Sequence, residues 1–407
     1  MSKRALLAKI IQDIRASYWF LPTILVLLAI VLVQVTLRID YSAQLLPDEW
    51  RTTQVAGARA VLSVIAAAVI GVAGVMFSLT IVAVSFASGN FGPRLIGNFM
   101  QDRGNQWSLG ILIATFVYAL LTLRAVQSPF GSEPSEAFVP HFSMLVAFGL
   151  TGVSILTMIY FVHHIPEIIN VSNISHTLGR RLRDAITALI DGQPEDAPDS
   201  QVEAPANAQS DGICLAGDGY IQTWNLGRLT RLAGDNDLVV EVCHEAGSFV
   251  SRFTPVLRVQ SDGGIGDDLR QELRDCFAIG PKPTETQNLL FVARQLSEMV
   301  ARALSPGVND PFTAINCLNW MYVGLGAAAC HGEGLKHRPR GRVLYPTVTF
   351  DDLLEATFAN SLPYIRTDSL VMKHLERLLE RLISETGNDD ARASLEAFAS
   401  EVAETGG

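Results

Sequence analysis

The chain has 407 residues, of which 49% are hydrophobic and only 18% charged, and its mean hydropathy is +0.26. Soluble domains carry about 25% charged residues, so this composition excludes an ordinary soluble protein of the same length. The charge is divided unevenly: residues 1–164 hold 10 Lys and Arg against 7 Asp and Glu, whereas the remainder holds 21 against 34. We therefore expect a membrane half followed by an acidic soluble half, whose lack of a basic run argues against nucleic acid as a partner.

Four apolar stretches predict transmembrane helices over 18–37, 60–86, 107–123 and 140–162. The first has about 20 residues, which matches a hydrocarbon core of about 30 Å at the helical rise. We interpret it as a retained helix, because it is longer than the apolar region of a signal peptide and no small-residue cleavage site follows it. The lipid bilayer is thus an expected partner.

The basic residues at the ends of these stretches predict their orientation. With the N-terminus inside, nine flanking Lys and Arg residues face the cytoplasm, and four face the other side. The cytoplasmic set is Lys3, Arg4, Lys9, Arg15, Arg94, Arg103, Arg180, Arg181 and Arg183; the opposite set is Arg38, Arg51, Arg59 and Arg124. The excess of basic residues on the cytoplasmic side predicts that both termini are cytoplasmic.

No ionisable residue lies in the core of any of the four stretches. Charges within a bilayer are costly and usually mark coupling sites, so their absence argues against a proton- or sodium-coupled transporter.

The second stretch carries small residues at helical spacing, which predicts a single stripe along one face of the helix. Its members are Ser63, Ala67, Gly71, Gly74, Ser78 and Ser85. Such a stripe permits close helix packing. Alternatively, a ring of these helices in an oligomer presents small and hydroxyl groups to a pore. Both interpretations stay open.

At the end of the fourth stretch, His163 and Glu167 are four residues apart, on one helix face. They are weak candidates for metal binding, and a hydrogen-bonded helix end is the alternative. We expect no metal and no cofactor. The five cysteines include no CxxC pair, so we expect them to be small buried side chains in a reducing cytosol.

The domains predicted from these patterns are a four-helix transmembrane domain (1–164), a helical stalk (165–190), an acidic linker (191–211), a small β module (212–262) and a helical domain (263–407). The fold class is thus an α-helical membrane protein with a cytoplasmic α+β part. The stalk residues have a short heptad-like seam, which favours packing on a neighbour. An amphipathic helix lying on the membrane or on the soluble domain is the alternative.

In the helical domain, an apolar helix from Leu289 ends at Ser305, Pro306 and Gly307, and Asp310 before Pro311 predicts the start of the next helix. Thr349 and Asp352 resemble a capping box that opens a further helix. The residues of this region with ligand-binding groups are Arg294, Arg302, Asn309, Asp310 and Thr313. They could bind a ligand beside a helix N-terminus. A helix-turn-helix whose Pro, Gly and Asp only set backbone angles is the alternative.

The run from Arg302 to Ala314, with Arg294, Gln295 and Leu296 before it, resembles the signature of the DUF2254 family of bacterial predicted membrane proteins. The segments Met76–Thr80 and Phe91–Leu95 and the order of elements along the chain resemble it as well. One departure is the run Lys282–Asn288, where an Arg-Thr pair and a Gln-Asp pair are expected. The resemblance implies a bacterial inner-membrane location and leaves the activity open.

The function expected from these patterns is an oligomeric, channel-like conduit made of several copies of the chain, with the cytoplasmic half as a regulatory domain. The alternative is a membrane-anchored sensor or scaffold whose cytoplasmic half binds a ligand or a protein. We expect no enzyme, because the chain has no nucleophile elbow, P-loop, HExxH motif or zinc spacing.

Overall fold

The computed structural model describes residues 17–42, 47, 53–92, 102–127, 138–191, 209–329 and 342–405. Most of the expected linker, as well as Arg94 and Cys330, lies outside these residues. The chain divides into two compact units: an N-terminal unit that holds the four long apolar helices, and a C-terminal unit that begins at Val171. Each unit is described by itself below.

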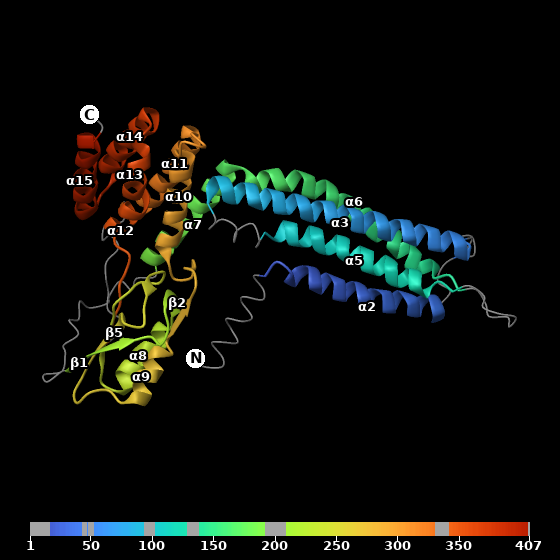
Figure 1. Cartoon of the computed structure of the whole chain (residues 1–407), viewed down its shortest axis with the longest axis horizontal. Coiled ribbons are helices and arrows are strands. Elements are labelled where there is room, and N and C mark those ends of the chain that lie inside the picture. Colours follow the sequence, from blue (N-terminus) through green and yellow to red (C-terminus); the bar gives the residue numbers. More distant parts are fainter. Residues whose placement is uncertain are drawn as a thin grey trace. The chain divides into compact units, whose positions relative to one another are not determined.

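Within its described residues, the N-terminal unit contains four helices that are each long and apolar enough to cross a membrane (Figure 1). They are α2 (Phe20–Ser42), α3 (Val55–Phe91), α5 (Arg103–Ala125) and α6 (His141–Ile169). All four predicted spans are confirmed as apolar helices, and each helix extends beyond its predicted range at one end or both. The centre of the unit is filled by large side chains such as Leu62, Leu112, Tyr118 and Phe161, each at most 2% exposed.

Polar side chains inside this unit join one helix to another. The hydroxyls of Thr36 and Tyr118 lie 2.9 Å apart, and the hydroxyl of Ser154 donates a hydrogen bond to that of Thr115 at 3.0 Å. At one end of the unit, the carboxylate of Asp40 in α2 accepts hydrogen bonds from the backbone N–H of Phe142 and from the N–H and hydroxyl of Ser143, at 2.6–3.0 Å. Asp40 therefore caps the first turn of α6 from another helix, where N–H groups have no partner within their own helix.

The C-terminal unit contains two sheets, of order β1-β5-β3-β7 and β4-β2-β6. The strands are β1 (Gln209–Cys214), β2 (Gly219–Trp224), β3 (Val239–Val242), β4 (Phe249–Val250), β5 (Pro255–Ser261), β6 (Phe277–Gly280) and β7 (Val343–Leu344). Helices α8 (Leu226–Asp235) and α9 (Asp267–Arg274) interrupt them. The expected β module is thus a mixed one, and it includes strands from outside 212–262, because β7 pairs in parallel with β3.

The rest of this unit is helical (Figure 1). Its helices are α7 (Val171–Asp191), α10 (Leu289–Ala303), α11 (Pro311–Ala329), α12 (Phe350–Leu354), the π-helix η3 (Glu355–Ala359), α13 (Asn360–Ile365), α14 (Ser369–Glu385) and α15 (Asp389–Thr405). The capping box predicted for Thr349 and Asp352 opens α12, with the N–H of Asp352 3.1 Å from the Thr349 hydroxyl.

Helix α7 packs its apolar face against α10 and α11 within the C-terminal unit. Its buried residues include Leu178, Leu182 and Ile186, each at most 1% exposed. Glycine permits the close approach on both helices: Gly179 of α7 faces Trp320, and Gly324 of α11 faces Leu182. The apolar residues expected to form a stalk seam are therefore covered by the chain's own helices.

Candidate functional site

The six small residues of α3 all lie on the exposed side of the helix in the N-terminal unit: Ser63, Ala67, Gly71, Gly74, Ser78 and Ser85. We call this set the α3 stripe. A Cβ atom added at Gly71 or Gly74 would meet no atom of the described residues within 4 Å, so none of them lies against the middle of the stripe.

The opposite side of α3 packs into the unit through Leu62, Ile65, Val69, Ala73 and Met76, which are at most 7% exposed. At 100° per residue these side chains point away from the stripe. The stripe therefore takes no part in packing the four helices of one chain, and both of its predicted roles require a partner outside the chain.

At the end of the N-terminal unit that holds the start of α5, the helices α3, α5 and α6 contribute to a polar cluster. The Nε2 atom of His164 in α6 lies 3.0 Å from Oδ1 of Asp102, and these side chains are 19% and 24% exposed. Asp102 also caps α5 by accepting a hydrogen bond from the N–H of Asn105 at 2.7 Å. The buried Asn105 side chain accepts a hydrogen bond from Thr80 of α3 at 3.2 Å.

Sequence reasoning missed the pairing of Asp102 with His164. The local signal for Asp102 is its position three residues before Asn105 at the start of an apolar helix, which is typical of an N-cap. No local pattern indicates that this cap lies beside a histidine 62 residues later in the chain. The pair joins α5 to α6 and supports the geometry of the helix ends.

The weak metal candidates His163 and Glu167 form an ion pair at 3.4 Å, with side chains 82% and 57% exposed. Among the described residues, no group of three or more His, Cys, Asp or Glu side chains could hold a metal ion.

In the C-terminal unit, Asp310 caps α11. Its carboxylate accepts hydrogen bonds from the Thr313 N–H at 3.1 Å and from the Thr313 hydroxyl at 2.6 Å, and its own N–H donates to the Ala303 carbonyl at 2.7 Å. Asn309 is exposed and has a φ of 49°, in the left-handed region that Asn tolerates. This turn therefore has a clear role in joining α10 to α11, and ligand binding by it stays a prediction.

The two predicted arginines do not converge on this turn together. Arg302 pairs with Glu298 one helical turn before it, at 4.0 Å. Arg294 lies eight residues before Arg302, which is about 12 Å along α10. Arg294 is thus the ligand candidate that lies farthest from the turn along α10, and ligand binding by the five residues stays a prediction.

Arg294 instead belongs to a charged group around Glu245, which precedes β4. Burial raises the pKa of the Glu245 carboxyl, the charge of Asp352 raises it further, and Arg294 opposes both effects. Glu245 was missed because it lies in a loop without a motif. With its raised pKa, the Glu245 carboxyl holds its proton more tightly than an exposed glutamate does.

The run 282–288, where the sequence departs from the family pattern, ties β2 to α10. The side chain of Gln287 accepts hydrogen bonds from the Thr223 hydroxyl at 2.8 Å and the Trp224 N–H at 3.0 Å, and it donates to the Trp224 carbonyl at 3.2 Å. The Thr284 hydroxyl donates to the Gln222 carbonyl at 3.2 Å. These contacts give Thr284 and Gln287 structural roles.

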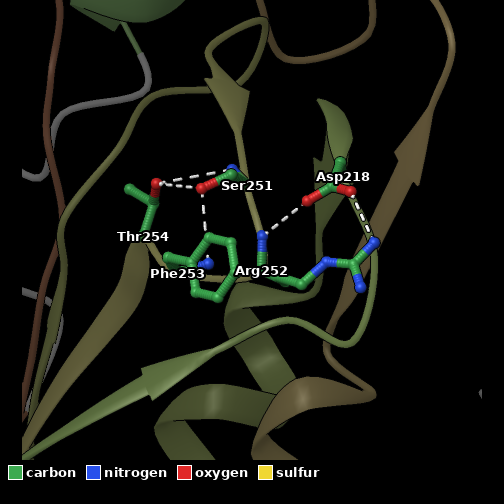
Figure 2. Close-up of polar contacts among 5 residues, drawn as sticks. All are labelled: Asp218, Ser251, Arg252, Phe253 and Thr254. Atoms are coloured by element: carbon green, nitrogen blue, oxygen red, sulfur yellow. Dashed lines mark hydrogen bonds and ion pairs between the residues drawn. The ribbon is translucent and has the colours of Figure 1, made fainter.

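A turn of the β module presents an exposed aromatic side chain (Figure 2). Phe253 is 83% exposed. Asp218 accepts hydrogen bonds from the N–H of Arg252 at 2.8 Å and from its guanidinium at 2.9 Å, and these bonds lower the pKa of the Asp218 carboxyl. The hydroxyls of Ser251 and Thr254 lie 2.9 Å apart across the turn. The turn is therefore held in one shape with its phenyl ring facing outward.

The four apolar helices and the mixed C-terminal unit define the class of this molecule: a membrane protein with a substantial helix and strand part outside its spans. Residues 15–381 match the family described as predicted membrane protein (DUF2254). The chain belongs to this family, and the resemblance inferred from the sequence motifs is confirmed.

Three mycobacterial proteins show the same relationship along nearly the full chain. The uncharacterized protein Rv1290c of Mycobacterium tuberculosis and the uncharacterized protein Mb1321c of Mycobacterium bovis are each 28% identical over 399 residues, which cover 95% of this chain and 75% of theirs. The uncharacterized protein MT1328 of a second Mycobacterium tuberculosis strain is 27% identical over the same length. No solved structure matches the chain.

Proposed function

We propose that this protein is an oligomeric, channel-like conduit of the bacterial inner membrane, with α3 of each copy nearest the axis and the C-terminal unit as a regulatory or assembly domain. The observation that carries the proposal is the exposure of the α3 stripe. Small residues on a membrane helix permit close approach to a neighbour or line a water-filled path, and the described helices of the chain leave them exposed.

The length of α3 supports a role at an axis. Its 37 residues correspond to about 55 Å, well above the hydrocarbon thickness of about 30 Å, so α3 tilts or extends beyond the bilayer. The proposed orientation, with both termini in the cytoplasm, rests on the excess of Lys and Arg in the flanks on that side. We propose a non-enzymatic role with it, because the sequence shows no spacing that would set a base beside a nucleophile.

Two adjacent alanines of α3 allow a matched test. Ala67 belongs to the stripe, whereas Ala68 is also exposed but lies 100° away around the helix. We expect Ala67→Leu to weaken self-association in detergent, measured by light scattering, and to reduce conductance in planar bilayers, while Ala68→Leu leaves both unchanged. A monomeric wild-type chain without conductance under voltage, tension and varied ions would overturn the proposal.

The second candidate function is a membrane-anchored sensor or scaffold, and the exposed Phe253 favours it. An aromatic side chain held outward on a rigid turn loses little conformational entropy when a protein partner covers it. The test uses a protein partner that the full wild-type chain captures. We expect Phe253→Ser to abolish this capture, whereas Leu370→Ser, at another exposed apolar position, leaves it intact. Equal capture by both variants would count against this function.

A further inference from the structure

The N-terminal unit has an apolar groove of about 430 Å³ that is formed by α2, α5 and α6. Its lining includes Leu28, Val31, Leu32 and Val35 of α2, with Thr115 of α5 and Val153 of α6. The groove is open along the α2 side, where Leu28 and Val31 are 58% and 59% exposed. The volume is typical of sites that bind a small molecule, which range from about 300 to 1,000 Å³.

The chemistry of the lining excludes a polar ligand inside the groove. Thr115 is the one polar residue of the lining, and its hydroxyl donates to the Ile111 carbonyl at 2.9 Å and accepts from Ser154 at 3.0 Å. With these partners in place, the lining offers its occupant only hydrocarbon contacts.

The shape of the groove fits a single chain of hydrocarbon. From Leu25 to Val35 the lining runs along ten residues of α2, which is about 15 Å at the helical rise. That length equals about half of a 30 Å hydrocarbon core, the depth of one leaflet.

A basic residue lies just beyond one end of the groove. Val31, Val35 and Arg38 recur at steps of four and three along α2, so Arg38 lies on the side of the helix that lines the groove, about 4.5 Å past Val35. Arg38 is exposed, and no ion pair joins it to another described residue. The nearby acid Asp40 is occupied by its hydrogen bonds to the start of α6.

From this arrangement we infer that the groove holds one membrane phospholipid, with an acyl chain along α2, α5 and α6 and its phosphate on the guanidinium of Arg38. The site lies in the leaflet where α2 ends. A guanidinium can bind a phosphate group through paired charge-assisted hydrogen bonds. These bonds distinguish the lipid in the groove from bulk lipid at the other faces of the unit. The inference is independent of the proposed conduit, because the groove does not involve the α3 stripe.

Native mass spectrometry of the full chain in detergent tests this site with phosphatidylglycerol and phosphatidylethanolamine as probes. We expect wild type to retain one lipid of either kind. Val153→Trp places an indole in the groove and should weaken retention. Ile159→Trp adds the same group about 120° away around α6, at a position that is 63% exposed and does not line the groove, and should not weaken it. If Val153→Trp fails to fold, Ala114→Phe fills the same groove from α5.

The phosphate contact is tested by Arg38→Gln, which should weaken retention about tenfold, and by its control Arg124→Gln, an exposed arginine at the end of α5. If Arg38→Gln lowers the retention of phosphatidylglycerol alone tenfold, Arg38 contacts an anionic headgroup. If it lowers the retention of both lipids equally, Arg38 contacts the phosphate itself. Retention by Val153→Trp and Arg38→Gln equal to that of wild type would overturn the inference.

Discussion

The contact between α7 and α11 predicts opposite effects for the same substitution at two helical glycines. A Cβ atom added at Gly179 of α7 would lie 2.6 Å from the Cβ of Trp320, a distance that side chains do not tolerate. A Cβ atom added at Gly326 of α11 would lie 3.8 Å from Leu382, an ordinary contact. Gly179→Ala and Gly326→Ala therefore raise the helix propensity by the same amount, but only Gly179→Ala brings the new methyl group too close to a neighbouring side chain.

The magnitudes follow from these distances. Alanine is about 1 kcal/mol more favourable than glycine in a helix interior, so Gly326→Ala should stabilise the C-terminal unit by about that amount. Overpacking a filled interface costs about 1–3 kcal/mol, which offsets or exceeds the gain at Gly179. The expected net effect of Gly179→Ala is thus about 0–2 kcal/mol of destabilisation, and Gly179→Leu should cost more.

Thermal unfolding of the purified full chain, followed by tryptophan fluorescence, measures both effects. For a unit of this size, 1 kcal/mol corresponds to about 2–4 °C in Tm. We expect Gly326→Ala to raise the Tm of the C-terminal unit by about that much and Gly179→Ala to leave it unchanged or lower it. A rise for Gly179→Ala equal to that for Gly326→Ala would show that α7 is not packed on α11, as for a stalk or a membrane-surface helix.

Three further predictions concern titratable groups and a cap. Burial raises the pKa of Cys276 to about 11 and the pKa of Cys317 to about 12. At pH 8, iodoacetamide should therefore modify Cys276 ~100-fold more slowly than an ordinary thiol and Cys317 more slowly still, because it reacts with the thiolate. Mass spectrometry measures both rates. The raised pKa of Glu245 means that the folded state binds its proton more tightly, so stability falls as pH rises from 4.5, the pKa of an ordinary glutamate, through the pKa of the folded state. Glu245→Gln should therefore raise the Tm at pH 7 and flatten its pH dependence. Asn still caps a helix, so Asp102→Ala should cost about 1 kcal/mol more than Asp102→Asn in chemical denaturation, and equal costs would contradict the cap.

The elements that sequence predicted well are those whose chemistry is local. The apolar spans are defined by length and composition within one segment. The start of α11 follows from Asp310 before Pro311, and the start of α12 from Thr349 with Asp352, because a cap and its helix are consecutive in the chain.

The features that sequence could not predict depend on distant partners. Strand β7 has two residues, Val343 and Leu344, and its pairing with β3 joins positions about 100 residues apart. A two-residue strand has no periodicity, so only the edge offered by β3 defines it. The hydrogen bonds of Gln287 to the end of β2 and of Asp40 to the start of α6 are likewise decided by tertiary contacts.

The placement of polar groups in the N-terminal unit bears on where a conducting path can lie. Charged residues at its helix ends hold one helix to another. Asp40 accepts a hydrogen bond from the start of α6, Asp102 lies beside His164, and Arg59 donates a hydrogen bond to the Val126 carbonyl at 3.1 Å. Inside, the hydroxyls of Thr36 and Ser154 bond to side chains of other helices, and bulky side chains fill the core. The groove formed by α2, α5 and α6 is apolar and suits hydrocarbon. Opening a path through one chain would break these contacts, whereas a path between copies at the α3 stripe breaks none, so the conduit that we propose has its path between copies of the chain.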